Sequence, residues 1–158
     1  MKRIHISIAA QTLALYDDAT LLKTYVVSTA SKGAGEQQGS EQTPRGRHLV
    51  RARIGAGQPL YTVFRGRRPT GERWSPELAA QHPMRDWILT RILWLSGLEP
   101  GFNRGGQCDS MRRYIYIHGT PDSEPMGLPG SHGCVRMRNT DILELFELVP
   151  PYTPVLIE

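Results

Sequence analysis

Two short segments near the C-terminal end gather the residue types that a thiol nucleophile requires. Tyr114-Ile-Tyr-Ile-His118-Gly-Thr120 supplies a histidine, and Gly130-Ser-His-Gly-Cys134-Val-Arg-Met137 supplies a cysteine, a second histidine and an arginine. A cysteine attacks as its thiolate, and its free pKa of about 8.5 must be met by a nearby base or by positive charge. These segments therefore predict a cysteine nucleophile that is served by a histidine.

Either histidine has a position from which it could act as the base for Cys134. His132 lies two positions before the cysteine, a spacing that puts both side chains on one face only in an extended segment. His118 ends an expected strand, which would hold a base rigidly against a nucleophile on a facing loop. We therefore predict that His118 is the base, that the Gly133 and Cys134 amides form an oxyanion hole, and that Arg136 binds a substrate carboxylate.

The segments that must position these residues indicate a mainly β fold with one or two short helices. Ser75-Pro76 predicts a capped helix to about Gln81, and Asn139-Thr140-Asp141 predicts the capped start of a second helix that Pro150 ends. Alternating or continuous apolar residues predict strands. The expected strands cover residues 4–8, 13–15, 22–28, 48–54, 60–64, 86–95, 113–118 and 153–157.

Length and composition indicate one globular domain over residues 1–158. Hydrophobic residues make up 39% of the chain and charged residues 22%, without a visible repeat or linker. No segment approaches the roughly 20 apolar residues of a membrane span. His5 and Ser7 interrupt the N-terminal apolar run, whereas a secretory signal needs about 7–15 unbroken apolar residues. With Met1 as the native start, we expect a cytoplasmic protein that has no membrane partner.

The net charge of +4 comes with clustered arginines, whose guanidinium groups pair well with phosphate and carboxylate. No interleaved aromatic residues and no nucleic-acid-binding motif accompany the charge, so we expect no nucleic acid partner. A solvated strand face explains the clusters most simply, and a ligand rich in carboxylates suits the same arginines. The clusters comprise Arg45, Arg47, Arg51 and Arg53, and then Arg65, Arg67 and Arg68.

The two cysteines, Cys108 and Cys134, lack the spacing of a redox or zinc pair, and we expect two free thiols in a reducing compartment. Cys108 has no base nearby in the sequence and is expected to be structural. An alternative of another class uses both cysteines with His118 and His132 as zinc ligands, although their spacing matches no standard zinc motif. The thiol mechanism itself needs no cofactor.

His118-Gly-Thr120 followed by Ser131-His-Gly-Cys-Val-Arg-Met137 resembles the signature of the L,D-transpeptidase catalytic domain, YkuD type. Tyr25-Val-Val-Ser-Thr29 and Thr43-Pro-Arg-Gly46 also resemble that domain, so the similarity covers nearly the whole chain. The resemblance implies a β-sandwich-like fold and attack on peptidoglycan stem peptides between an L-configured centre, usually of diaminopimelate, and terminal D-alanine. The residues that it implicates are Cys134 as nucleophile, His118 as base, and His132, Gly133, Arg136, Ser131 and Tyr116 in shaping the site and binding substrate.

The acceptor that resolves a Cys134 thioester decides which activity results. An amine would give a cross-link or a D-amino acid exchange, whereas water would give a trimmed tripeptide. Because cross-linking occurs outside the membrane and a cytoplasmic chain is expected, we favour water, and with it an L,D-carboxypeptidase that recycles muropeptides. L,D-transpeptidation is the alternative within this class, and a non-catalytic wall-binding module is an alternative outside it.

Overall fold

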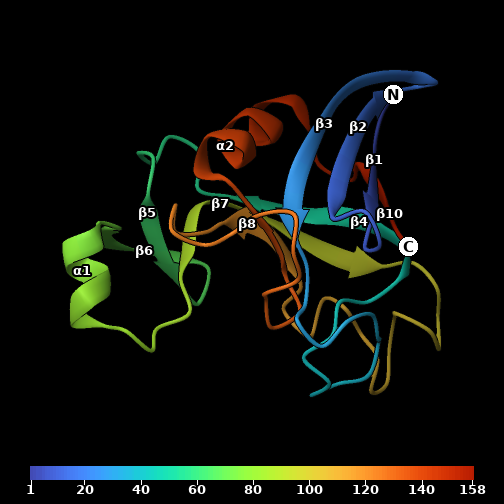
Figure 1. The fold of residues 1–158 in the computed structure, drawn as a ribbon. Helices are drawn as coiled ribbons and strands as arrows, with labels where there is room; N and C mark the ends of the chain where they lie inside the picture. The colour runs from blue at the N-terminus through green and yellow to red at the C-terminus, as the bar shows by residue number, and fades with distance from the viewer.

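A computed structural model describes residues 1–158 and confirms a mainly β fold with short helices (Figure 1). The helices are α1 (Pro76–Gln81) and α2 (Asn139–Leu148). The strands are β1 (Lys2–Ser7), β2 (Thr12–Asp17), β3 (Thr20–Ser28), β4 (Gly46–Ile54), β5 (Thr62–Arg65), β6 (Arg68–Arg73), β7 (Ile88–Gly97), β8 (Tyr116–Gly119), β9 (Val135–Met137) and β10 (Pro154–Ile157).

The strands form one sheet that closes on itself. Their order is β4-β10-β1-β2-β3-β9-β8-β7-β5-β6, and an additional pairing of β4 with β7 completes a ring that leaves only β5 and β6 as an extension. Closure removes the free edges that would otherwise expose unpaired backbone groups. The main core of 19 buried residues fills this ring and includes Ile142, Leu145 and Phe146 of α2, which covers one opening against β7 and β8 (Figure 1).

The pairing of β8 with β9 positions the predicted site. These strands are parallel, with His118 opposite Arg136 and Ile117 opposite Val135. All four residues of β8 and all three of β9 are buried. Because Cys134 directly precedes β9, the register brings it beside the first residue of β8. The long strand β7 pairs with β8 on its other side, so β8 is hydrogen-bonded along both edges.

Several sequence-based boundaries were wrong. The expected strand 113–118 begins only at Tyr116, since residues 111–114 form a turn in which Tyr114 has φ +57°. Strand β9 was not predicted, because three residues are too few to show a periodicity. Strand β6 was missed because its residues are polar and mostly exposed, as is typical of an edge strand.

The two helix starts had opposite outcomes. The Ser75 hydroxyl accepts the Leu78 N–H at 3.1 Å, which confirms the predicted cap of α1. In α2 the cap prediction was wrong: Arg138 is the N-cap, without a side-chain hydrogen bond, and Asn139 is already helical. The Asn139 amide instead donates to the Thr120 carbonyl at 2.7 Å. Neither helix is long and apolar enough to cross a bilayer.

Candidate active site

Cys134 lies at the end of a tightly bonded turn that leads into β9. The Ser131 hydroxyl donates to the Cys134 carbonyl and accepts the Gly133 N–H at 3.2 Å. The Thr43 hydroxyl donates to the Gly133 carbonyl at 2.9 Å, which ties the turn to a distant segment. Gly133 has φ +132°, a conformation that residues with a side chain rarely adopt. The glycine before the cysteine is therefore required by the shape of this turn.

The Cys134 sulfur is enclosed by strand β8 and by the residues that precede it. The Tyr116 N–H donates to Sγ at 3.3 Å, and the thiol donates to the Tyr114 carbonyl at 3.3 Å. The side chain also packs against a cluster that contains Phe64 and Ile92. Burial raises the pKa of the Cys134 thiol to about 12, and nearby Asp86 adds to the increase.

The thiol is therefore protonated at neutral pH in the free protein. The Tyr116 N–H, Arg136 and Arg113 each favour the thiolate and lower its pKa, but burial outweighs them. The sequence offered two means of obtaining a thiolate, a nearby base and positive charge. The burial of the thiol makes positive charge alone insufficient, so a nucleophilic Cys134 would need the base.

His118 has the properties of such a base. The residue is only 2% exposed, and its Nδ1 lies 2.6 Å from the Gly119 carbonyl, which can only accept a hydrogen bond. Nδ1 therefore carries the proton, and Nε2 is left as an acceptor that makes no hydrogen bond within the protein. Burial lowers the pKa of His118, despite opposing contributions from the Gly119 carbonyl and Asp86, and keeps the ring neutral.

His132 and Arg136 meet at one carboxylate, that of Asp86. The His132 side chain is 61% exposed and its Nδ1 is 3.7 Å from Asp86 Oδ2, whereas Arg136 donates to Asp86 Oδ1 at 3.1 Å. Arg136 also donates to the Gly130 carbonyl at 3.0 Å and lies 3.9 Å from Glu124. Its charge is thus already paired, and its predicted role as a carboxylate ligand stays a prediction.

The predicted side chains gather around one pocket of about 270 Å³. His118, Cys134, His132, Ser131, Tyr116 and Arg136 all line it, while Gly133 contributes only to the turn below. Cys108 lies outside this lining and its thiol is 3.3 Å from the Gly105 carbonyl. Six further residues line the pocket. Arg67, Asp86 and Ile88 are brought there by the fold from distant segments, which no local pattern could indicate, whereas Arg113, Tyr114 and Ile115 directly precede β8.

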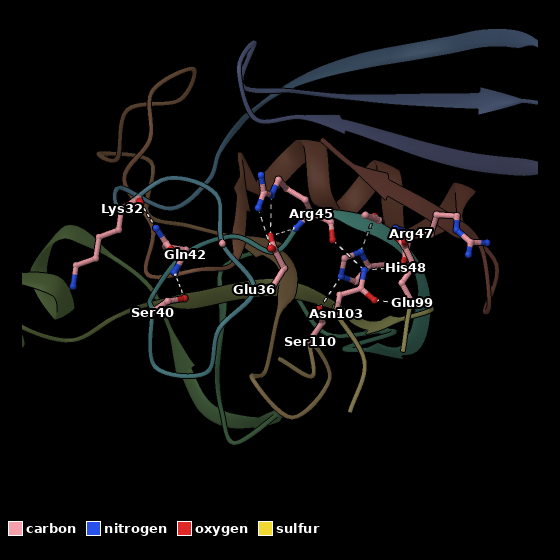
Figure 2. Close-up of polar contacts among 12 residues, drawn as sticks. Lys32, Glu36, Ser40, Gln42, Arg45, Arg47, His48, Glu99, Asn103 and Ser110 are labelled. Atoms are coloured by element: carbon pink, nitrogen blue, oxygen red, sulfur yellow. Dashed lines mark hydrogen bonds and ion pairs between the residues drawn. The ribbon is translucent and has the colours of Figure 1, made fainter. Parts of the chain in front are cut away.

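Arg113 fastens the glycine-rich loop that follows β3 beside this pocket. Its guanidinium donates to the Gln42 carbonyl at 2.6 Å and to the Gly35 carbonyl at 3.3 Å. Within the same loop, Glu36 accepts two hydrogen bonds from the Arg45 guanidinium, at 2.9 and 3.0 Å (Figure 2). The sequence alone did not predict where this loop would lie. The structure holds it against the turn that carries Cys134.

The arrangement supports acyl transfer through a thiol more directly than the zinc alternative. No cluster of three or more histidine, cysteine, aspartate or glutamate side chains is placed to hold one metal ion. Of the two amides predicted to form an oxyanion hole, that of Gly133 is bonded to the Ser131 hydroxyl. The Cys134 amide is bonded to no side chain. Of the two amides it is therefore the better candidate for stabilising a developing oxyanion.

Comparisons with known proteins agree with this geometry. The family model described as the L,D-transpeptidase catalytic domain, YkuD, matches residues 1–157. The relative named L,D-transpeptidase YkuD of Bacillus licheniformis is 29% identical over 155 residues, which is 98% of this chain and 64% of that protein. Over a shorter stretch, L,D-transpeptidase YbiS of Escherichia coli K12 is 56% identical across 43 residues, which is 27% of this chain and 14% of the relative.

Solved structures show the same fold. An L,D-transpeptidase from Mycobacterium smegmatis superposes with a TM-score of 0.59 at 17% identity, covering 99% of this chain and 58% of that structure. An L,D-transpeptidase from Xylanimonas cellulosilytica gives 0.58 at 20% identity, with 99% of this chain and 60% of that structure covered. The chain thus spans somewhat less than two thirds of these relatives.

Proposed function

The chain belongs to the YkuD family of L,D-transpeptidase catalytic domains, and we propose that it catalyses cysteine-dependent acyl transfer on peptidoglycan stem peptides. The observation that carries this proposal is that a buried His118, with Nδ1 bonded to a backbone carbonyl and Nε2 open, lines the same pocket as the Cys134 thiol. The names of the relatives supply the reaction class, and the two side chains supply the chemistry. Each step below is assigned to a residue of this chain.

Acylation of Cys134 is the first half of the reaction. His118 Nε2 takes the thiol proton while Sγ adds to the carbonyl carbon of the L-configured centre that precedes D-alanine. The Cys134 N–H stabilises the resulting oxyanion, a contribution of about 3 kcal/mol for a typical single donor. When the tetrahedral intermediate collapses, the imidazolium returns its proton to the leaving amine. D-Alanine departs, and the acyl group remains on sulfur as a thioester.

Deacylation reverses the roles of the same groups. His118, again neutral, takes a proton from the acceptor as it attacks the thioester carbonyl. Collapse of the second intermediate releases the acyl product and returns the proton to the sulfur, which restores the Cys134 thiol. The acceptor can be water, which gives a tripeptide, or an amine, which gives an exchanged or cross-linked peptide.

Water is the acceptor that we propose, which makes the activity that of an L,D-carboxypeptidase acting in muropeptide recycling. The pocket is open to solvent on the side of His132, whose side chain is 61% exposed, so water can reach a thioester on the sulfur. Transpeptidation or D-amino acid exchange is the second candidate, and the names of the relatives favour it.

A single incubation separates these outcomes. The protein is mixed with a disaccharide-free stem tetrapeptide in ¹⁸O-labelled water, with and without an excess of D-methionine, and the products are weighed by mass spectrometry. Release of D-alanine with one ¹⁸O in the tripeptide establishes hydrolysis. Replacement of D-alanine by D-methionine establishes exchange and rejects water as the favoured acceptor. If D-alanine is not released under either condition, the whole proposal fails.

A further inference from the structure

The loop between β5 and β6 contains an arginine, Arg67, at a position whose backbone conformation does not favour arginine. The two residues between these strands are Gly66 and Arg67, with φ +55° and +62°. Two-residue hairpin loops with positive φ at both positions favour glycine, asparagine and aspartate. A longer side chain in this conformation is uncommon, and such strained positions concentrate at functional sites. The reason for Arg67 has to be sought in its side chain.

The Arg67 guanidinium is held by three aromatic residues. Nη1 donates to the Tyr116 hydroxyl at 3.1 Å, and Cζ lies 4.9 Å from the ring centroids of both Trp94 and Tyr114. Cations are attracted to ring faces at such distances, so these contacts fix the guanidinium in one place. Tyr114 is itself a residue with positive φ. Two uncommon backbone conformations therefore cooperate to build this contact.

Arg67 differs from the other two arginines of the pocket in its partners. Arg136 is paired with Asp86 and donates to the Gly130 carbonyl, and Arg113 donates to the carbonyls of the loop beside it. Arg67 makes no ion pair, and its hydrogen-bond acceptor within the protein is a phenol. The pocket wall thus carries a guanidinium that is held against aromatic rings, accessible to solvent and free to bind an anion.

We propose that Arg67 binds a carboxylate of the acyl-donor peptide and is a specificity-determining residue of the pocket. Its planar fork suits a carboxylate, and the neighbouring ring of Tyr114 gives an apolar surface for the aliphatic part of the same ligand. This inference rests on the proposed function, because it names a substrate group for that site. Tyr116 connects the two functions, since its N–H donates to the Cys134 sulfur and its hydroxyl accepts from Arg67.

Alkylation of Cys134 tests the anion site without any peptide substrate. Iodoacetate and iodoacetamide differ in charge but react alike with the thiol, and peptide mass spectrometry measures the rate at Cys134 alone. In Arg67→Gln we expect the ratio of the iodoacetate rate to the iodoacetamide rate to fall about fivefold, through loss of one charge-assisted contact. Arg67→Lys should retain part of the ratio. Arg68→Gln is the matched control, because Arg68 is exposed on the same hairpin and does not line the pocket.

Peptide turnover tests the assignment to the donor. With a tetrapeptide whose carboxylates are free, Arg67→Gln should raise KM about tenfold with kcat nearly unchanged. With the fully amidated peptide, the wild type and the variant should have equal KM. An unchanged alkylation ratio, or an equal rise of KM for both peptides, overturns the inference. If no peptide is turned over at all, the proposed function fails, while the alkylation ratio still decides whether Arg67 is an anion site.

Discussion

Two buried histidines in this fold have nearly the same surroundings and different uses. His118 is 2% exposed and His48 is fully buried. The Nδ1 of each donates to a backbone carbonyl, that of Gly119 at 2.6 Å and that of Gly46 at 3.0 Å. Burial lowers the pKa of both rings. By burial, tautomer and charge, the two imidazoles are equivalent.

The two histidines differ in what their Nε2 atoms contact. His48 Nε2 accepts a hydrogen bond from the Ser110 hydroxyl at 2.7 Å, so this imidazole and its hydroxyl partner resemble a nucleophile and its base (Figure 2). Ser110 is fully buried, however, and no substrate can reach it. The Nε2 of His118 makes no protein hydrogen bond, and its side chain lines the pocket of Cys134.

The surroundings of His48 explain what that enclosed pair does. The Asn103 amide donates to the carbonyls of Arg45 and Arg47, each at 3.0 Å, and the Glu99 carboxylate accepts the Arg47 N–H at 2.7 Å (Figure 2). These bonds attach the loop after β7 to the start of β4. The comparison teaches that an open acceptor beside a pocket, rather than the residue types alone, distinguishes a candidate base from a structural histidine.

The largest contrast in activity is expected between removal of the Cys134 thiol and removal of the Ser110 hydroxyl. Cys134→Ala is expected to lower the release of D-alanine from the tetrapeptide by at least about 10⁴-fold, because no nucleophile remains. Ser110→Ala should leave that rate within about threefold of the wild type, because the hydroxyl has only a structural role. A discontinuous assay of free D-alanine measures both. Turnover that survives in Cys134→Ala would contradict the thiol mechanism.

Replacement of His118 is the next most severe change. His118→Gln removes the acceptor nitrogen while it keeps a polar side chain of similar length, and we expect kcat/KM to fall by about 10³-fold. The melting temperature serves as the control, since a variant that has simply unfolded would lose activity for another reason. A folded His118→Gln protein with near-normal turnover would transfer the role of base to another residue, with His132 the first candidate.

The comparison also marks what the sequence could and could not predict. Cys134 and His118 were found because they lie in two short, contiguous motifs, and the main strands were found from their alternating apolar residues. No pattern in the sequence indicates a partner for His48. Its partner Ser110 lies 62 positions further along the chain, so only the fold brings them together.

Other misses have the same origin. Asp86 pairs with Arg136 across 50 positions, and no local pattern could have indicated that the arginine is already neutralised. The cap predicted at Asn139 was wrong because its carboxamide oxygen accepts from the Thr90 hydroxyl at 2.6 Å, a contact from another strand. Arg67 was named only as part of an arginine cluster, because strand β6 and therefore the hairpin were not predicted. Its position becomes informative only when the hairpin and its φ values are known.

Replacement of His48 should show the opposite profile to that of His118. His48→Gln leaves buried partners imperfectly bonded, and we expect the free energy of unfolding to fall by about 2 kcal/mol. The change in kcat/KM at 25 °C should stay below about threefold. Urea denaturation measures the first quantity, and His5→Gln is the matched control at a partly exposed site, where the contact with Glu158 contributes under about 1 kcal/mol. An equal fall in the free energy of unfolding in both variants would mean that the buried cluster around His48 does not contribute more to stability than the His5 contact.

The smallest expected effect is on how stability and activity depend on pH. Both histidines have a folded-state pKa below the ordinary value of 6.5, so the unfolded chain binds more protons at mildly acidic pH. The stability that each neutral ring contributes is complete above pH 6.5 and is lost as the pH falls through 6.5 toward the folded-state pKa. This loss can reach about 1.4 kcal/mol per pH unit for one group.

His48→Gln should therefore make the unfolding free energy less dependent on pH between about 6.5 and 5, while the acidic limb of kcat/KM stays in place. His118→Gln should flatten the stability curve and abolish that limb, because only there does the proton that destabilises the fold also occupy the nitrogen that must accept one from Cys134. An acidic limb that shifts in His48→Gln would mean that the two histidines are coupled, and the distinction between a structural and a reactive imidazole would have to be abandoned.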